Sequence, residues 1–402
     1  ESNCDAFDTG HSSTSISLAI GMAKARELKK EKNNVFAVIG DGALSGGMAF
    51  EALNNAARLK SNLVIVLNDN QMSISKNVGG MSKYLGNIRT SANYTEFKED
   101  VETKLRKSHI GNALADSIKG AKDAVKRFFV PGMLFEDMGI TYIGPIDGHD
   151  VKQMVSAFES ASKMQKAVIV HVCTKKGKGY LPAEEDPSAF HGIAPFKPSD
   201  GTLKNKEKYL TYTYVFSRKL VELADKDEKI VAISAAMPSG TGLNRMAERF
   251  PDRFFDVGIA EEHAVTFAAG MASKGMKPVG AIYSTFFQRA YDQILHDVCI
   301  GRLPVIFAVD RAGLVGSDGE THQGMFDISY FNSMPNMTVM APKNVLELEK
   351  MLEFAAGFDG PIAIRYPRGK AYTGLKEYDT KIEYGKSEKI TGGADIALLA
   401  VG

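Results

Sequence analysis

The fold of this chain is decided by residues 35–72, which read VFAVIGDGALSGGMAFEALNNAARLKSNLVIVLNDNQM. Residues 35–39 and 63–67 are short apolar runs rich in Val, Ile and Leu, which predict two buried strands. Residues 43–59 combine helix-forming residues with apolar positions at helical spacing. The stretch therefore predicts a strand–helix–strand unit in an open parallel sheet, and such sheets bind ligands at the carboxyl ends of their strands.

Polar residues stand at the carboxyl ends of both predicted strands. Gly40-Asp41-Gly42 follows the first strand, and Asn68-Asp69-Asn70 ends the second. Three interpretations are open: a polar crossover turn without a ligand, a dinucleotide-binding loop, and a site for a diphosphate and a metal ion.

The residue types favour the third interpretation. The dinucleotide pattern GxGxxG requires a third glycine where this chain has Ser45. Asp41 and Asn70 offer the hard oxygen ligands that Mg²⁺ prefers. The glycines and the helix start leave backbone amides open to phosphate. Only a diphosphate–metal site would use the polar residues after both predicted strands, so we prefer this interpretation.

The composition is that of an ordinary globular protein. The 402 residues are 44% hydrophobic and 24% charged, with a net charge of +1, which gives no support for nucleic acid or an acidic membrane as partner. No run approaches the roughly 18 apolar residues of a membrane span. Three scattered cysteines predict reduced thiols. We expect a cytoplasmic protein, with a plastid location open if a transit peptide preceded Glu1.

Strand and helix patterns alternate along the rest of the chain, on both sides of an aperiodic stretch at residues 182–208. Further strands are predicted at residues 139–143, 167–172, 230–234, 254–258, 279–283, 305–309, 362–365 and 394–401, and residues 338–340 lead to a predicted helix. A first helix is predicted to be opened by residues 10–15 and to run to about residue 30. Further helices are predicted at about residues 151–163, 211–224, 259–271, 287–300 and 344–356, with a charged helical region at 83–128 and a turn at 144–150. This alternation predicts an α/β fold class with two domains, each a mostly parallel sheet flanked by helices.

One spacing in the first half resembles a known motif. GDGA, with the last Asn of NDN 29 positions after its Asp, resembles the thiamine-diphosphate motif. Thiamine chemistry also needs a carboxylate in an apolar pocket beside the aminopyrimidine ring, and an aromatic face against that ring. Glu261 and Glu262 both open a predicted helix, and position alone does not separate them. Phe286 is the candidate for the ring contact.

Longer motifs make the resemblance specific. In chain order they read TGHSSTSIS, GDGALSGG, LNDNQMSIS, IDGHD, KKGKGY, DVGIAEEHAVTFAAG, IYSTFFQRAYDQ, DRAGLVGSDGETHQG and RYPRG. The chain resembles the 1-deoxy-D-xylulose-5-phosphate synthase family of transketolase-like thiamine-diphosphate enzymes. The resemblance implies a transferase that condenses pyruvate with D-glyceraldehyde 3-phosphate, releases CO₂ and leads to isoprenoids and thiamine. It also implies thiamine diphosphate and Mg²⁺ as cofactors, and a homodimer.

The resemblance assigns roles to particular residues. It implies that Mg²⁺ is held by Asp41, Asn70 and the carbonyl of Met72. Catalytic roles fall on Glu261, His11, Arg289 and His322. The residues implied to bind the cofactor are His11, Ser13, Gly40, Asp41, Gly42, Ala43, Asn70, Met72, Ile74, Lys176, Ile259, Glu261, Phe286 and Arg289. Those implied to bind substrates are His191, Tyr283, Arg311, Asp318, His322 and Arg368, with Arg311 and Arg368 on the triose phosphate.

The predicted domains follow the same resemblance. We expect a diphosphate- and Mg²⁺-binding domain at residues 1–200, a linker at 201–209, a pyrimidine-binding domain at 210–380, and the start of a truncated third domain at 381–402. Family members also carry a segment before the GHSS motif. The alternatives are transketolase itself, a 2-oxoacid dehydrogenase E1 component, or a cofactor-binding fragment without full catalysis.

Overall fold

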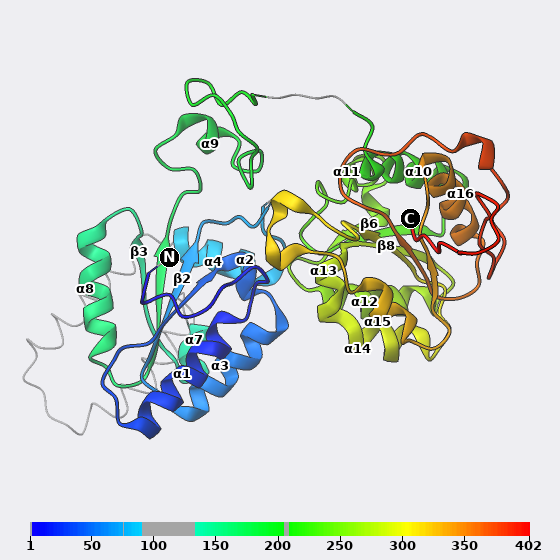
Figure 1. The fold of residues 1–402 in the computed structure, drawn as a ribbon. Helices are drawn as coiled ribbons and strands as arrows, with labels where there is room; N and C mark the ends of the chain where they lie inside the picture. The colour runs from blue at the N-terminus through cyan, green and yellow to red at the C-terminus, as the bar shows by residue number, and fades with distance from the viewer. Residues whose placement is uncertain (1, 75, 91–132, 205–208) are drawn as a thin grey trace, which may run out of the picture. The chain divides into compact units, whose positions relative to one another are not determined.

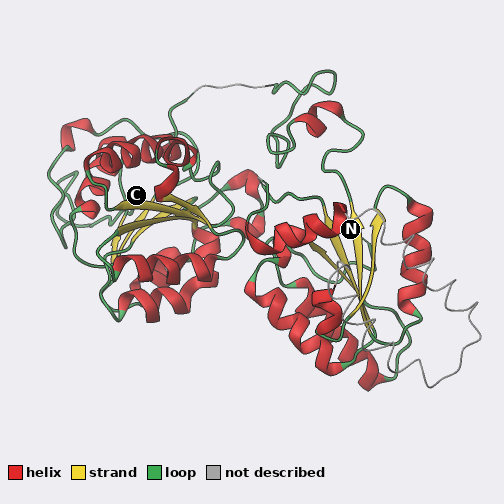
Figure 2. Ribbon diagram, turned by 180° about the vertical axis from the view of Figure 1, so that it is seen from behind, coloured by secondary structure: helices red, strands yellow, loops and turns green. Residues whose placement is uncertain are grey.

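The computed structural model describes residues 2–74, 76–90, 133–204 and 209–402. Contacts divide the chain into two units (Figure 1). One unit is Ser12–Thr202, and the other joins Glu1–His11 to Leu203–Gly402. Each unit has its own parallel sheet with helices against it (Figure 2), so the predicted α/β fold with two sheets is confirmed. In the described ranges, no helix has the length and apolar character needed to cross a membrane.

The sheet of the Ser12–Thr202 unit has four parallel strands in the order β1-β2-β4-β3. They are β1 (Phe36–Gly40), β2 (Leu63–Asp69), β3 (Thr141–Asp147) and β4 (Ala167–Cys173). Gly40 pairs in register with Asn68, and Asp69 pairs with Cys173. The carboxyl ends of β1, β2 and β4 therefore lie at one edge of the sheet, where three loops begin.

Helices cover both faces of this sheet. They are α1 (Ser15–Lys29), α2 (Asp41–Leu44), α3 (Gly47–Leu59), α4 (Gly79–Thr90), α7 (Met133–Asp137), α8 (Val151–Ser162) and α9 (Leu181–Glu185). Ile16 of α1 and Leu53 of α3 share one core with Ile65 of β2. Ala161 of α8 shares a second core with Val64, the neighbour of Ile65. Successive residues of β2 thus point to opposite, covered faces, as the apolar run predicted.

The helix predicted at residues 43–59 is divided into two. Gly46 is extended, and Ser45 Oγ donates a hydrogen bond to the carbonyl of Gly42 at 2.7 Å. A serine that bonds to nearby backbone competes with helix hydrogen bonds, which explains why α2 stops after one turn. The break leaves Asp41 on a separate turn of helix at the sheet edge.

The turn predicted at residues 144–150 is partly wrong. β3 runs on to Asp147, because its pairing with β4 resumes at Ile146 after a shift in register. The helix that follows begins as predicted, since the side chain of Asp150 accepts hydrogen bonds from two backbone N–H groups of the first turn of α8.

Two polar regions, residues 83–128 and 182–208, show little hydrophobic periodicity in the sequence. In the charged helical region predicted at residues 83–128, α4 continues to Thr90, and residues 91–128 lie outside the described ranges. The aperiodic stretch at 182–208 contains most of the short helix α9, and its other described residues form no strand or α-helix.

The second unit has a six-stranded parallel sheet in the order β6-β5-β7-β8-β10-β9. Its strands are β5 (Ile230–Ser234), β6 (Phe254–Asp256), β7 (Lys277–Tyr283), β8 (Ile306–Asp310), β9 (Thr338–Met340) and β10 (Ile362–Arg365). Its α-helices are α10 (Tyr212–Lys226), α11 (Asn244–Arg249), α12 (Glu261–Ala272), α13 (Ser284–Phe287), α14 (Tyr291–Gln293), α15 (Asp327–Asn332) and α16 (Val345–Ala356). Within this unit, α10, α11 and α16 lie on one face of the sheet, and α12, α14 and α15 on the other (Figure 1).

Shorter helical turns complete this unit. They are η1 (Pro251–Arg253), η2 (Gln288–Ala290), η4 (Gly316–Asp318), η5 (Glu320–His322), η6 (Lys376–Tyr378) and the π-helical η3 (Ile294–Cys299). Thr211 and Asn344 cap α10 and α16 by accepting a hydrogen bond from a backbone N–H of the first turn.

Three predictions for this unit are corrected. The helix predicted at residues 287–300 begins earlier, at Ser284, and is a series of short α, 3₁₀ and π turns. The short helices α11 and α15 were not predicted, because six residues show too little periodicity. Residues 394–401 form no strand and are exposed, and in the part of the chain that the structure describes neither sheet includes them.

Candidate functional site

Asp41 lies directly after β1 and opens α2, with 6% of its surface exposed. Its Oδ2 accepts hydrogen bonds from the backbone nitrogen of Gln71 and from Nδ2 of Asn77, each at 2.8 Å. Its Oδ1 is buried and has no hydrogen-bond partner among the described residues. Burial and the neighbouring charge of Asp69 raise the pKa of Asp41 to about 6. A buried carboxylate oxygen without a donor is suited to binding a cation.

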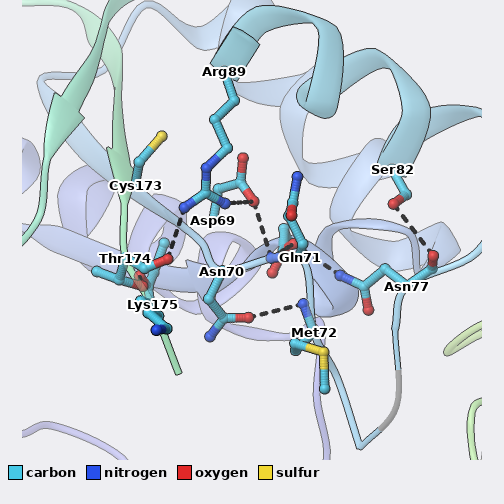
Figure 3. A network of polar contacts seen from close by, with 12 residues as sticks. Asp69, Asn70, Gln71, Met72, Asn77, Ser82, Arg89, Cys173, Thr174 and Lys175 are labelled. Carbon is cyan, nitrogen blue, oxygen red and sulfur yellow. Dashed lines mark hydrogen bonds and ion pairs between the residues drawn. The ribbon is translucent and has the colours of Figure 1, made fainter. Parts of the chain in front are cut away.

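The turn after β2 brings a second oxygen donor to the same place. Asn70 Oδ1 accepts a hydrogen bond from the backbone nitrogen of Met72 at 2.9 Å (Figure 3). Gln71 between them has a φ of 62°, and its carbonyl accepts from the backbone nitrogen of Asn77 at 3.1 Å. Gln71 and Asn77 both bind Asp41 as well, so the turn is held against the Asp41 carboxylate.

These residues fit a magnesium ion. Asp41 could supply a carboxylate, Asn70 an amide oxygen and Met72 a backbone carbonyl, and these are the hard ligands that Mg²⁺ prefers. Gly42 allows the close approach of the two turns, because a Cβ atom at this position would lie 2.9 Å from Asn77 Oδ1 and 3.0 Å from Ser73 Cβ. The unpartnered Oδ1 of Asp41 gives the set one oxygen that is free for the ion.

Further predicted cofactor residues of this unit line the same edge. Ser13 is buried, and its hydroxyl donates to the carbonyl of Ala43 at 2.7 Å. Lys176 Nζ donates to the carbonyl of Ser73 and lies 3.0 Å from His191 Nδ1. Partial burial lowers the pKa of Lys176. Lys176 thus places a cation beside the loop that follows Met72, where a phosphate group would be stabilised. Gly40 ends β1, and Ile74 is half-buried in that loop.

In the other unit, Glu261 opens α12, a few residues after the end of β6, and is 2% exposed. Arg289 donates a hydrogen bond from Nη1 to Glu261 Oε2 at 3.1 Å. Burial raises the pKa of Glu261 in spite of the opposing effect of Arg289. Its neighbours Ile259 and Glu262 are half-buried. The structure thus distinguishes the two glutamates, and Glu261 is the one in an enclosed environment.

An aromatic cluster surrounds Phe286 in α13. Its ring stacks on Tyr283 with the centroids 5.7 Å apart and the planes inclined by 17°. His11 and His322 approach the same ring edge-on, at centroid distances of 5.0 and 5.3 Å. Phe286 is half-buried, so part of its ring remains open to a ligand.

His11 is held on this unit by hydrogen bonds. Its Nε2 lies 2.9 Å from Thr285 Oγ1 and 3.0 Å from the carbonyl of Thr321. Burial and the positive charge of Arg289 lower its pKa, so the neutral imidazole is favoured near pH 7. The resemblance implies that His11 binds the cofactor, and these hydrogen bonds and its ring contacts are with the unit that carries Glu261.

The predicted substrate residues also meet in this unit. Arg311 follows β8 with a φ of 58°, and its Cζ lies 3.8 Å above the centre of the Tyr283 ring. Arg311 Nη1 donates to the carbonyl of Gly240 at 2.6 Å. Arg368 Nη1 lies 3.1 Å from Asp318 Oδ1, and Arg311 Nε lies 3.9 Å from Asp318 Oδ2. Arg311 Nη1 also lies 3.2 Å from Asp310 Oδ1, so the two arginines are paired with two carboxylates. The guanidinium groups themselves are of the kind that binds an anionic group.

Gly240 explains how Arg311 and Tyr283 fit together. A Cβ atom on Gly240 would lie 1.8 Å from Tyr283 Oη, so any other residue would displace the tyrosine. Burial raises the pKa of Tyr283 to about 12, so its hydroxyl keeps its proton near pH 7. Tyr283 is thus a neutral hydrogen-bonding group beside the arginine pair.

The predicted site residues fall into two groups. The Ser12–Thr202 unit holds Ser13, Gly40, Asp41, Gly42, Ala43, Asn70, Met72, Ile74, Lys176 and His191. The other unit holds His11, Ile259, Glu261, Tyr283, Phe286, Arg289, Arg311, Asp318, His322 and Arg368. Sequence reasoning did not identify Asn77 or Thr285, because a side-chain amide in a loop and a threonine beside aromatic residues carry no distinguishing pattern.

Comparison with known families assigns the two parts of the chain separately. Residues 1–174 match the family described as 1-deoxy-D-xylulose-5-phosphate synthase, in its N-terminal domain. Residues 208–373 match the transketolase pyrimidine-binding domain. The two matches occur in the order that the sequence motifs predicted.

Curated relatives match the whole chain. The 1-deoxy-D-xylulose-5-phosphate synthases of Lachnoclostridium phytofermentans, Clostridium tetani and Halothermothrix orenii are 62%, 57% and 55% identical over 403, 403 and 404 residues. All three alignments cover 100% of this chain. The chain spans 64%, 65% and 64% of these relatives, in the same order, so it corresponds to somewhat less than two thirds of their length.

Solved transketolases align only loosely. An inactive β4 tetramer of a split-gene transketolase is 29% identical over 44% of this chain and 58% of its own, with a TM-score of 0.40. The transketolase of Campylobacter jejuni is 19% identical over 89% of this chain and 61% of its own length, with a TM-score of 0.38. The family assignment therefore rests on the two domain matches and the curated relatives. By these, residues 1–174 match the 1-deoxy-D-xylulose-5-phosphate synthase family, and the whole chain is similar to its curated members.

Proposed function

We propose that the protein carrying this chain is a transferase that condenses pyruvate with D-glyceraldehyde 3-phosphate to 1-deoxy-D-xylulose 5-phosphate and CO₂. This reaction is the first step of the methylerythritol-phosphate route to isoprenoids. The observation that carries the proposal is the presence, in one chain of this family, of the oxygen donors around Asp41 and the buried carboxyl of Glu261.

The first unit supplies the metal and diphosphate site. Asp41, Asn70 and the carbonyl of Met72 would hold Mg²⁺, and Lys176 would neutralise one phosphate. Other cofactor contacts in this unit would come from Ser13, Gly40, Gly42, Ala43 and Ile74. When bound, thiamine diphosphate supplies an acidic ring carbon that acts as nucleophile and electron sink towards 2-oxo acids.

The second unit would bind the aminopyrimidine end of the cofactor and exchange a proton with it. Glu261 would hold a proton on its carboxyl beside the aminopyrimidine ring, and its raised pKa supports that state. Arg289 fixes the orientation of the carboxyl through the hydrogen bond to Oε2. Phe286 would pack against the ring, and Ile259 would contact it beside Glu261.

Histidines and arginines would act on the substrates. His11 and His322 flank the Phe286 ring and would exchange protons with substrate oxygens, since His11 is kept neutral by its burial. Arg311 and Arg368 would bind the triose phosphate through charge-assisted hydrogen bonds. Asp318, Tyr283 and His191 would orient the polar groups of the substrates.

The organisation of the protein is part of the proposal. Residues 1–200 would form the diphosphate- and Mg²⁺-binding domain, 201–209 the linker, 210–380 the pyrimidine-binding domain, and 381–402 the beginning of a third domain. We further propose that the protein acts as a homodimer in the cytoplasm.

The test is a reconstitution with thiamine diphosphate and Mg²⁺. Pyruvate and D-glyceraldehyde 3-phosphate are added together and singly, and CO₂ and the sugar phosphate are followed. Joint dependence on both substrates, with equal amounts of the two products, supports the proposal. Transfer of a ketol unit from a ketose phosphate without CO₂ would assign transketolase activity instead. Cofactor binding without turnover would indicate a binding fragment.

A further inference from the structure

Asp69, the last residue of β2, is not a predicted ligand, yet it is completely buried at the edge of the metal site. Its Oδ2 lies 3.0 Å from Nε2 of His171, which is also completely buried. The hydroxyl of Tyr142 lies 2.7 Å from Nδ1 of the same histidine. With a proton on Nε2, His171 donates to Asp69 and accepts from Tyr142, so the orientation of the Asp69 carboxylate is fixed from the sheet side.

The other oxygen of Asp69 faces the turn that carries the metal ligands. Asp69 Oδ1 accepts from the backbone nitrogen of Gln71 at 3.1 Å, and Asp41 Oδ2 accepts from the same nitrogen at 2.8 Å. Gln71 has a φ of 62°, a left-handed conformation that is strained for a residue other than glycine. One N–H group shared by two buried carboxylates offsets this strain and fixes the turn between Asn70 and Met72.

Arg89 connects the same carboxylate to a third segment. Its Nη1 lies 3.4 Å from Asp69 Oδ1, and its Nη2 donates to the carbonyl of Thr174 at 2.7 Å (Figure 3). The backbone nitrogen of Thr174 donates in turn to the carbonyl of Asp69 at 2.8 Å. Thr174 lies two residues before Lys176, the predicted phosphate-binding lysine. Asp69 therefore joins the segments that carry Asp41, Asn70 and Lys176.

A second metal site is the competing explanation of this cluster. Ligand atoms of Asp69, His171 and Cys173 lie within 4.8 Å of one another. However, the guanidinium of Arg89 stands against the same carboxylate, and Nε2 of His171 is already engaged by Asp69. Burial also raises the pKa of the Cys173 thiol to about 11, which opposes the thiolate that a metal requires. The contacts are those of a group that positions its neighbours.

We propose that Asp69 is a positioning residue for the Mg²⁺–diphosphate site: without binding the ion, it holds the Asp41, Asn70–Met72 and Thr174–Lys176 segments in the arrangement that binds it. This inference rests on the proposed cofactor function. Loss of a partner that orients metal ligands typically weakens metal binding by about 10–100-fold.

The test compares Asp69→Ala with Asp327→Ala as a matched control. Asp327 is also completely buried and paired with an arginine, since Arg365 Nε lies 2.9 Å from its Oδ2, but it belongs to the other unit. Mg²⁺ is titrated calorimetrically into the full chain with saturating thiamine diphosphate, and thermal unfolding is measured in parallel. We expect Asp69→Ala to weaken Mg²⁺ binding by about 10–100-fold and Asp327→Ala to leave it unchanged, although both lower the unfolding temperature.

Two further variants separate positioning from stability. Asp69→Asn keeps an oxygen acceptor for the Gln71 nitrogen and should recover most of the Mg²⁺ affinity. Arg89→Ala changes a side chain that is 26% exposed, so it tests the link to Thr174 even if Asp69→Ala does not fold. It should weaken Mg²⁺ binding several-fold.

The outcomes distinguish this inference from the proposed function. Mg²⁺ affinities of Asp69→Ala and Arg89→Ala equal to that of the unmodified chain would overturn the positioning role alone. Equal weakening in Asp327→Ala would overturn it too, because the effect would then follow stability. Failure of the unmodified chain to bind thiamine diphosphate with Mg²⁺ would overturn the proposed function and this inference with it.

Discussion

Arg289 donates a hydrogen bond from Nη1 to Oε2 of Glu261 over 3.1 Å, yet the pKa of this glutamate is raised. Desolvation of the buried carboxyl outweighs the attraction of the guanidinium. The pair therefore combines a fixed orientation with a carboxyl that holds its proton more tightly than an exposed glutamate does. That combination is what proton exchange with an aminopyrimidine ring requires.

Replacement of this carboxyl should abolish most of the turnover. Glu261→Gln keeps an acceptor for Arg289 but cannot exchange a proton, so kcat should fall by about 10²–10⁴-fold. Release of CO₂ from pyruvate with D-glyceraldehyde 3-phosphate measures the effect, and calorimetry should show that the cofactor still binds. The matched control is Glu262→Gln, one residue further along the first turn of α12. Equal losses in the two variants would contradict the assignment of Glu261.

The same burial predicts a pH-dependent stability difference. Because the pKa of Glu261 is raised above its ordinary value of 4.5, the folded chain binds the proton more tightly than the unfolded chain. This contribution to stability is complete below pH 4.5 and is lost as the pH rises through the folded-state pKa. Glu261→Gln has no such loss, so its unfolding temperature should exceed that of the unmodified protein at pH 7 and approach it near pH 4. If the unfolding temperatures of Glu261→Gln and the unmodified protein differ by the same amount at pH 7 and near pH 4, the pKa of Glu261 is not raised.

Magnesium binding should weaken in acid. Asp41 must be ionised to bind the cation, and its pKa is raised to about 6 because burial and Asp69 disfavour the charge. Mg²⁺ affinity should therefore decline by up to about tenfold for each pH unit below about 6. Calorimetric titration of Mg²⁺ at several pH values, in the presence of thiamine diphosphate, measures the slope. The same titration of Mg²⁺ into free thiamine diphosphate measures how much of the pH dependence comes from the cofactor. If Mg²⁺ affinity changes with pH equally with and without the protein, Asp41 does not cause the change.

The arginine that stacks on Tyr283 should determine affinity for the phosphorylated substrate. Arg311→Met removes a charged donor, so the KM for D-glyceraldehyde 3-phosphate should rise by about 10–100-fold, while the KM for pyruvate changes little. Steady-state kinetics with each substrate varied in turn measures the two constants. Arg302→Met is the control, since Arg302 bonds to Asn336 on the surface of the same unit. A parallel rise in both KM values would point to a general disturbance of the site.

Much of the fold could be predicted from local sequence. The strands β5 and β10 were predicted with their observed bounds, because short apolar runs bounded by polar residues have few other ways to bury their side chains. Errors arose where a single contact decides the outcome. Ser45 ends α2 by bonding to Gly42, and residues 394–401, although apolar, pair with none of the described strands.

For the site, the sequence by itself determined which chemical groups are available and in what order. The oxygen donors after β1 and β2, the lysine after β4, and the glutamate that opens α12 follow from residue type and spacing, because parallel strands bring their carboxyl ends to one edge. Motifs of this length also identified the family, which the comparisons confirmed.

Only the tertiary structure decided which of these groups are buried, how readily they hold a proton, and which residues form hydrogen bonds with them. Burial separates Glu261 from Glu262, and the donors of Asp41 come from Gln71 and Asn77, which lie 30 and 36 residues further along the chain. In the sequence Asp69 is one of three polar residues after a predicted strand, and the role proposed for it emerges only from contacts with residues far along the chain, such as His171. The physical reason is that desolvation and hydrogen-bond geometry depend on the atoms around a side chain, which packing determines and local sequence does not.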